Sequence, residues 1–193
     1  MRVAGIDVGK TGAIAVVESG QLIFVTMLNP VLEMGSVGAL LRAWQVKIAY
    51  VEKAQAMPGQ GVSSVFTYGQ GFGEIVGTLK ALKIPFVLVS PRKWTTWAHQ
   101  GCSAGTPKAR SAEAAQRLFP GQSFTPNNCK KPSDGMIDAA LIAVWGEVEH
   151  LKQSADIYPL VRPASGSGGA LSEEAAKNSV DGSISSDVQA SSN

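Results

Sequence analysis

The chain has 193 residues, of which 45% are hydrophobic, so it is long enough for one domain with its own core. Its two cysteines argue against a disulfide framework, and no apolar run is long enough to cross a membrane. A strand expected from residue 2 leaves no room for a signal peptide, so we expect a cytoplasmic protein with no membrane partner.

The net charge of +2 conceals an uneven distribution. Residues 1–152 carry 15 basic and 10 acidic side chains, whereas residues 153–193 carry two and five. The segment 92–131 holds seven basic residues and one acidic residue. Such a segment is either a phosphate-binding surface or a set of solvated loops and helix faces, and charge alone does not separate the two.

The first half of the chain predicts strands followed by helices. Two or three strands are expected over about 2–28, with a turn at the letters ESG. A helix over about 34–45 and a short buried strand over 48–54 follow. A second helix is expected over 63–82, and its apolar stripe consists of Val65, Phe72, Val76 and Leu79.

The second half continues the alternation. A strand is predicted over 85–90, and the letters PRKW indicate a short helical turn. The next helix has Thr106 as N-cap, Pro107 at its first position and Pro120 as its stop. The last helix begins near Ser133. This alternation predicts an α/β fold with a mixed sheet flanked by helices over residues 1–152. Residues 153–193 are of low complexity, and we expect a disordered C-terminal tail.

The stretch GIDVGKT resembles the end of a nucleotide-binding P-loop. A P-loop needs four residues between its first glycine and the Gly-Lys pair, and only three separate Gly5 from Gly9. It also needs a helix after it, whereas apolar β-branched runs follow here. We therefore expect no nucleotide cofactor, and Asp7, a carboxylate in an apolar strand, becomes the residue to explain.

Four carboxylates stand in apolar settings. Asp7 lies in the first strand, and Glu52 ends a buried strand. Asp134 and Asp138 are four apart on the last helix, inside or beside its apolar stripe. Each alone has an ordinary explanation, such as a turn cap, a salt bridge or a helix-dipole contact. Together they predict a shared magnesium site, because burying a lone charge costs several kcal/mol.

Four stretches carry a resemblance to a known family: GIDVGKTGAIAVV, the block from VEKAQAMPGQG to GTLKAL, VSPRKW and KKPSDGMIDAALIA. Over about residues 1–150 the chain resembles the RuvC family of Holliday junction resolvases, in particular its small phage-type members. The family belongs to the ribonuclease H-like superfamily, so the resemblance implies a ribonuclease H-like mixed sheet. The spacing of four between the last two acids resembles the phage-like group. Ser133 stands where many relatives have histidine.

The resemblance implies a crossover junction endodeoxyribonuclease. Asp7, Glu52, Asp134 and Asp138 match the family's metal ligands, with two Mg²⁺ ions per active site and Mn²⁺ as a substitute. Two such ions stabilise the attacking and leaving oxygens of phosphodiester hydrolysis. The implied substrate is a four-way DNA junction, and its two-fold symmetry implies a homodimer that makes paired nicks.

Several further residues are candidate DNA contacts. Phe66 or Tyr68 resembles the family's aromatic residue at the junction centre, and packing in the core or in a dimer is the alternative for each. Basic candidates for phosphate contact are Lys10, Arg92, Lys93, Lys108, Arg110, Lys130 and Lys131.

The second predicted helix contains four glycines, each of which costs roughly 1 kcal/mol relative to alanine. This favours close approach by a second protomer or a DNA backbone, with close packing on the sheet as the alternative. The glycines are Gly69, Gly71, Gly73 and Gly77.

Three other functions compete with junction resolution. An actin-like kinase needs a second Asp-Gly-Thr hairpin and a longer chain. A non-catalytic DNA-binding relative would have lost one of the acids. A nuclease of the same superfamily that acts on other branched DNA or on RNA–DNA hybrids stays open.

Overall fold

The computed structural model describes residues 1–9, 11–28, 34–53, 59, 61–127 and 129–157. Its strands are β1 (Arg2–Asp7), β2 (Ala13–Glu18), β3 (Gln21–Met27), β4 (Ile48–Glu52) and β5 (Phe86–Val89). Its helices are α1 (Met34–Ala43), α2 (Val62–Ala81), α3 (Pro91–Ala98), α4 (Pro107–Leu118) and α5 (Asp134–Ile157). The predicted disordered tail falls largely outside the described residues, while α5 runs five residues past the expected domain end at 152.

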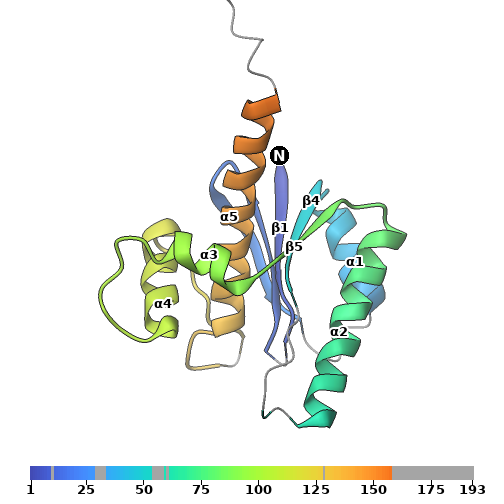
Figure 1. Ribbon diagram of the computed structural model, residues 1–193, viewed down its shortest axis with the longest axis horizontal. Coiled ribbons are helices and arrows are strands. Elements are labelled where there is room, and N and C mark those ends of the chain that lie inside the picture. The colour runs from blue at the N-terminus through green and yellow to red at the C-terminus, as the bar shows by residue number, and fades with distance from the viewer. Residues whose placement is uncertain (10, 29–33, 54–58, 60, 128, 158–193) are drawn as a thin grey trace, which may run out of the picture. The chain divides into compact units, whose positions relative to one another are not determined.

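The five strands form one mixed sheet in the order β3-β2-β1-β4-β5. The first three strands are antiparallel neighbours, and β1, β4 and β5 run parallel. Helices α3, α4 and α5 cover one face of the sheet, and α1 and α2 cover the other (Figure 1). The fold class expected from the alternation of strands and helices is therefore confirmed.

Most predicted elements occur where the sequence placed them. Thr106 caps α4, since its hydroxyl accepts a hydrogen bond from the backbone N–H of Ala109 at 3.2 Å. One prediction was too short: the turn expected at PRKW is the eight-residue helix α3. Its apolar residues Trp94 and Ala98 are buried one turn apart, so packing extends the turn that Pro91 begins.

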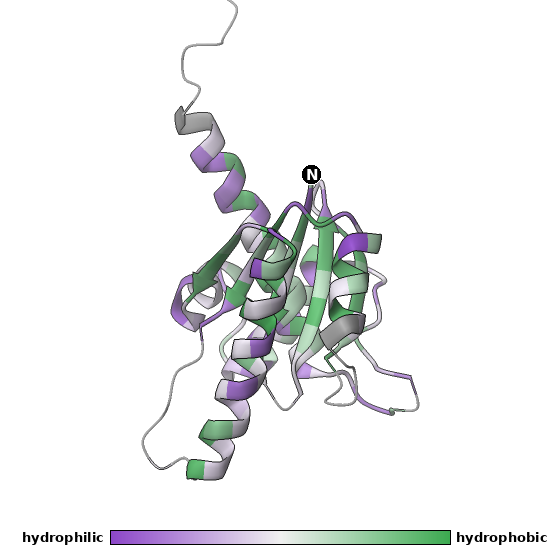
Figure 2. Cartoon of the chain, turned by 90° about the vertical axis from the view of Figure 1, so that its right-hand side faces the viewer, coloured by the Kyte–Doolittle hydropathy of each residue, from purple (hydrophilic) through white to green (hydrophobic). Residues whose placement is uncertain are grey.

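The stripe predicted for α2 is partly wrong. Leu79 is buried, but Val65, Phe72 and Val76 are only half-buried, and the second buried residue is Ile75. The N-terminal half of α2 extends beyond the sheet (Figures 1 and 2), so half of the expected stripe has little to pack against.

The α2 glycines do not pack closely on the sheet either. A Cβ atom built on Gly69, Gly71, Gly73 or Gly77 meets no atom within 4 Å in the described structure. Packing within the described chain therefore does not explain these glycines, and approach by a partner stays a prediction. In the part of the chain that the structure describes, no helix is both long and apolar enough for a bilayer.

Candidate active site

The first two acids lie at one edge of the sheet. β1 and β4 are parallel neighbours in register from Val3 opposite Ile48 to Ile6 opposite Val51. Asp7 and Glu52 are the next residues and end their strands. Carboxyl ends of parallel strands meet at the same edge of a sheet, which brings the two side chains together.

Glycines let α5 come close enough to add its acids. A Cβ atom on Gly5 in β1 would overlap the backbone of Ala139 and Ala143 in α5. One on Gly135 would overlap the carbonyl of Thr11 and lie 3.1 Å from Oδ2 of Asp7. The start of α5 is thus pressed against the turn after β1, near enough for the charge of Asp138 to act on Asp7.

Burial and mutual repulsion change the acidity of two of these groups. Burial, then the charge of Glu52 and a hydrogen bond with it, and then Asp138 raise the pKa of Asp7 to about 8. Burial is also the main reason that the pKa of Asp138 is raised to about 7, while hydrogen bonding with Ser111 opposes the shift. Carboxyls in such a cluster favour a bound proton or a cation.

Asp134 lies at the mouth of the site rather than inside it. Its side chain is 50% exposed, and its Oδ2 accepts a hydrogen bond from Nζ of Lys108 at 2.6 Å. The sequence placed both α5 acids in or beside the apolar stripe, but Asp134 is the first residue of the helix and faces outward. Lys108, predicted as a phosphate contact, is therefore beside the acids.

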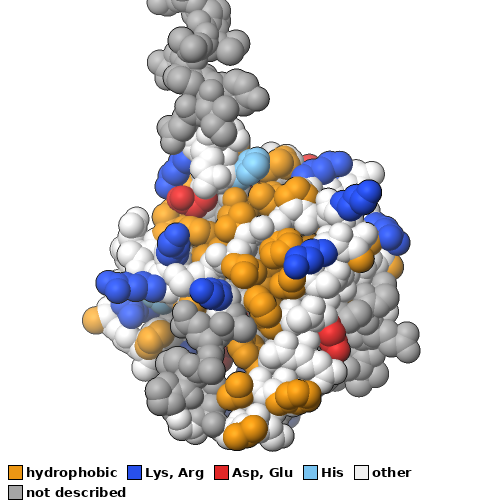
Figure 3. Space-filling view, turned by 45° about the vertical axis from the view of Figure 1, so that its right-hand side comes forward, with side chains coloured by type: hydrophobic (Ala, Val, Ile, Leu, Met, Phe, Trp, Pro, Cys, Tyr) orange, Lys and Arg blue, Asp and Glu red, His pale blue; other side chains and the backbone are white. Residues whose placement is uncertain are grey.

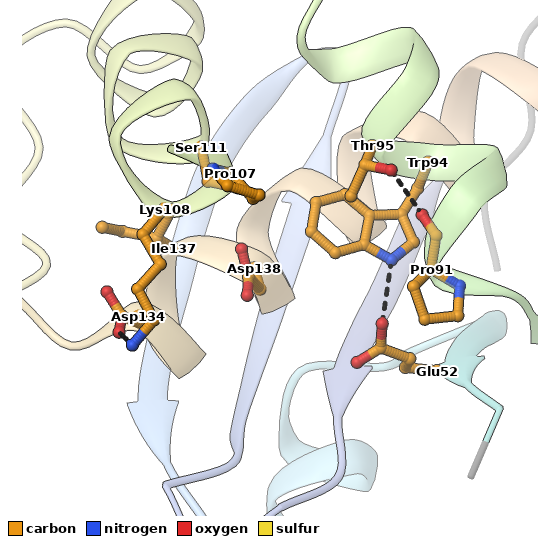
Figure 4. Close-up of a pocket in the computed structure, with 10 residues that line it drawn as sticks. All are labelled: Glu52, Pro91, Trp94, Thr95, Pro107, Lys108, Ser111, Asp134, Ile137 and Asp138. Carbon is orange, nitrogen blue, oxygen red and sulfur yellow. Dashed lines mark hydrogen bonds and ion pairs between the residues drawn. The ribbon is translucent and has the colours of Figure 1, made fainter. Parts of the chain in front are cut away.

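A cavity of about 210 Å³ adjoins the acids, between α3, α4, α5 and the end of β4. Figure 4 shows Lys108 with Asp134 at one end, Trp94 with Glu52 at the other, and Asp138 between them. The indole Nε1–H of Trp94 donates to Oε1 of Glu52 at 3.2 Å.

The four carboxylates are ligands of the type that fits a magnesium site, although their side chains do not converge on a single ion position. Within the described ranges, no group of three or more His, Cys, Asp and Glu side chains lies close enough together to hold an ion. Asp134 in particular is turned toward Lys108. The four acids nevertheless offer only carboxylate oxygens, the ligand type that Mg²⁺ prefers. Asp7 and Asp138 gain most from a cation, because they are buried beside other carboxyls.

The two aromatic candidates have different surroundings. Phe66 is 74% exposed, so the core alternative is wrong for it in the described structure. Tyr68 is half-buried beside the turn after β1, where a Cβ atom on Gly9 would lie 3.9 Å from its ring. Burial, then the charges of Glu52 and Asp7, raise the pKa of Tyr68 to about 12, which places it near the acids.

The basic candidates are spread over three elements. Arg92 and Lys93 are exposed on α3, and Lys130 and Lys131 are exposed in the loop before α5. Arg110 is half-buried, and its Nε has no hydrogen-bond partner among the described residues. Lys10 lies outside the described residues.

Sequence reasoning missed the residues that position the acids. Trp94 and Ser111 were read as parts of helices, and Gly5 and Gly135 drew no attention. A glycine within a helix is unfavourable without close packing, so Gly135 carried a usable signal. Ser133 caps α5, because its Oγ lies 3.5 Å from the backbone N of Met136.

Comparison with known proteins finds similarity in the fold but not in the sequence. No protein-family model matches the sequence, and no curated protein sequence shows significant similarity to it. RuvC from T. thermophilus in complex with a Holliday junction substrate matches with a TM-score of 0.59 at 17% identity, over 79% of this chain and 96% of that chain.

Two further solved structures agree. Another Thermus thermophilus RuvC structure matches with a TM-score of 0.54 at 20% identity, over 79% of this chain and 97% of that chain. Fowlpox virus resolvase in complex with Holliday junction DNA matches with a TM-score of 0.51 at 16% identity, over 76% of this chain and 99% of that chain. The chain therefore has the RuvC-like form of the ribonuclease H-like fold that the resemblance predicted.

Proposed function

We propose that the protein is a metal-dependent endonuclease that cuts four-way DNA junctions. The observation that carries the proposal is that Asp7 and Glu52, at the ends of β1 and β4, and Asp138 on α5 lie near enough for both of the other charges to act on Asp7. This meeting occurs in a fold shared with two proteins solved in complex with Holliday junctions.

The acids would hold two Mg²⁺ ions, with Mn²⁺ as a substitute. The charges of both Glu52 and Asp138 act on Asp7, so Asp7 would be the acid able to serve both ions. When bound, the ions supply charge stabilisation at the attacking and leaving oxygens of the phosphodiester. Asp134 completes the set after leaving Lys108, whose ammonium is then free to contact a backbone phosphate.

The DNA would lie over the open side of the acids. Lys130 and Lys131 stand in the loop that leads into α5, and Arg92 and Lys93 stand on α3, so both segments next to the acids present exposed cations. Phe66 projects from the exposed part of α2 and is available to stack on a base. Tyr68, turned to the acids, is better placed to line the site.

A symmetric dimer would supply the second nick. Exposed hydrophobic side chains gather in a strip on one face (Figure 3). In the described residues, large exposed hydrophobics include Val87 and Leu88 on the edge strand β5 and Val62 and Phe66 on α2. Together with the open α2 glycines, they offer a surface for a second copy.

A substrate panel tests the proposal. The full-length protein is incubated with a synthetic four-way junction, linear duplex, a flap and an RNA–DNA hybrid, with Mg²⁺ and with EDTA. Symmetric nicks in the junction that require Mg²⁺ and are lost in Asp7→Asn support the proposal. Preferential cutting of the hybrid would replace it with a ribonuclease H-type activity, and no cutting at all would overturn it.

A further inference from the structure

The side of the site formed by α3 and α4 provides one hydrogen-bond donor for each of three acids. Trp94 on α3 donates to Glu52, and Lys108 on α4 donates to Asp134. Ser111 on α4 lines the same cavity as Asp138 (Figure 4), and its hydrogen bond with that carboxyl opposes the rise in the pKa of Asp138. Lys108 is exposed and mobile in principle, whereas Trp94 and Ser111 are buried.

Packing in the core fixes the position of Trp94 independently of its hydrogen bond to Glu52. Its side chain is 3% exposed and packs in the same core as α5. An indole has a single donor and no acceptor, so its buried N–H needs one partner, and here that partner is Oε1 of Glu52. Leaving this buried donor unpaired would be unfavourable, so the bond also fixes the rotamer of Glu52. Glu52 also forms a hydrogen bond with Asp7, so Trp94 contacts a carboxylate that already faces the other acids.

Ser111 is held in a comparable way. It is 7% exposed, and its Oγ lies 3.0 Å from Nε2 of His99. A hydroxyl carries one proton and two lone pairs. When Asp138 is ionised, Ser111 can donate its proton to that carboxylate and accept the Nε2–H of His99. His99 thus supports the orientation of Ser111 from the side away from the acids.

We propose that Trp94 and Ser111 are positioning residues, which hold the carboxylates of Glu52 and Asp138 in the orientation that binds metal. The inference rests on the proposed metal-dependent function. Hydrogen-bond partners of metal ligands typically change metal affinity or activity by about 10–100-fold when they are removed. Neither residue needs to touch the DNA or the ions.

The test measures metal binding without DNA. Mn²⁺ affinity of the full-length protein is determined by calorimetry for the parent, Trp94→Phe and Ser111→Ala. Matched controls are Trp97→Phe, on the same helix, and Ser103→Ala, whose hydroxyl contacts Glu113 instead. We expect at least a 10-fold weaker affinity for the first pair and less than a two-fold change for the controls, with junction binding in EDTA unchanged for all four.

A double-mutant comparison separates positioning from general loosening of the core. If Trp94 acts only through Glu52, Trp94→Phe should weaken Mn²⁺ binding in the parent but add nothing to Glu52→Gln. A further loss in the Glu52→Gln background would overturn the inference. Unchanged Mn²⁺ affinity in both Trp94→Phe and Ser111→Ala would also overturn it.

Folding outcomes are equally decisive. If one variant does not fold, the other decides, because the two donors lie on different helices. If both are unfolded in EDTA, the donors stabilise the core rather than orient the acids, and the inference fails. If the parent neither binds Mn²⁺ nor cuts DNA, the proposed function is refuted. If the parent does both and the variants bind Mn²⁺ as tightly as the parent, only this inference is refuted.

Discussion

Helices α5 and α2 lie on opposite faces of the sheet and use glycine in opposite ways. Where α5 meets β1 and β4, a methyl group at Gly5, Gly135 or Gly146 would overlap a neighbouring residue. On α2, four glycines face open space. The α5 glycines are explained inside the chain, since they let Asp138 reach Asp7. Among the described residues the α2 glycines have no such explanation, so approach by another molecule stays a prediction.

The largest expected effect comes from a methyl group forced into the close contact between β1 and α5. Gly5→Ala places a methyl group in the backbone of Ala139 and Ala143, which cannot move without shifting α5. We expect the free energy of unfolding to fall by about 3 kcal/mol or more. Urea denaturation followed by circular dichroism measures this.

Gly73→Ala is the matched control on α2. The new methyl group meets no atom within 4 Å, and alanine is the better helix former. The free energy of unfolding should rise by up to about 1 kcal/mol. Equal destabilisation by the two substitutions would remove the contrast between the helices. If Gly73→Ala gains stability but loses dimerisation in sedimentation, the partner on α2 is a second copy.

The next effect is a pH dependence confined to the acid cluster. The pKa of Asp7 is raised to about 8 from its ordinary value of 3.8, so the folded state binds more protons than the unfolded state between these values. Stability in EDTA should therefore fall as pH rises from about 4 to about 8, with a slope of up to about 1.4 kcal/mol per pH unit for one such group.

Chemical denaturation between pH 4 and 9 checks this expectation. Asp7→Asn should lose the part of the slope that Asp7 contributes, because its side chain does not titrate, while Asp138, whose pKa is also raised, keeps the remainder. Mg²⁺ should flatten the parent curve. Parent stability that rises over this range in EDTA would contradict the raised pKa.

A smaller effect is expected where α5 meets the β2–β3 turn. Glu147 is 5% exposed, and its carboxylate accepts hydrogen bonds from the backbone N–H groups of Ser19 at 2.8 Å and Gly20 at 2.7 Å. Glu147→Gln keeps the shape but puts an amide donor against one of these groups. We expect a loss of about 1–3 kcal/mol in stability, with Mn²⁺ affinity unchanged. A change in Mn²⁺ affinity would show that this end of α5 also positions the acids.

The smallest effect on folding should come from Phe66. Because it is 74% exposed, Phe66→Ala should leave the melting temperature nearly unchanged. Loss of a stacked base should weaken junction binding by about 1–3 kcal/mol. Electrophoretic mobility shift in Ca²⁺ measures the affinity. Unaltered binding would remove Phe66 from the DNA contacts.

Much of the fold could be predicted, and the candidate acids could be singled out, because both leave local signals. Apolar runs predict the strands, and Thr106 with Pro107 predicts the start of α4. Asp7 is conspicuous because it is a carboxylate in an apolar strand. The roles of Trp94 and Ser111 could not be predicted, since each depends on which residue lies opposite after α3 and α4 pack. The division of roles between Phe66 and Tyr68 likewise depends on how far α2 extends past the sheet.

The central claim is that the acids form one metal site rather than separate structural partners. Asp7→Asn tests it most directly, through its stability in EDTA and its cutting of a junction in Mg²⁺. Because the substitution removes repulsion with Glu52 and Asp138, we expect a variant at least as stable as the parent in EDTA. It should bind the junction normally and cut it with no detectable rate. Cleavage near the parent rate, or a variant that no longer folds, would contradict the claim.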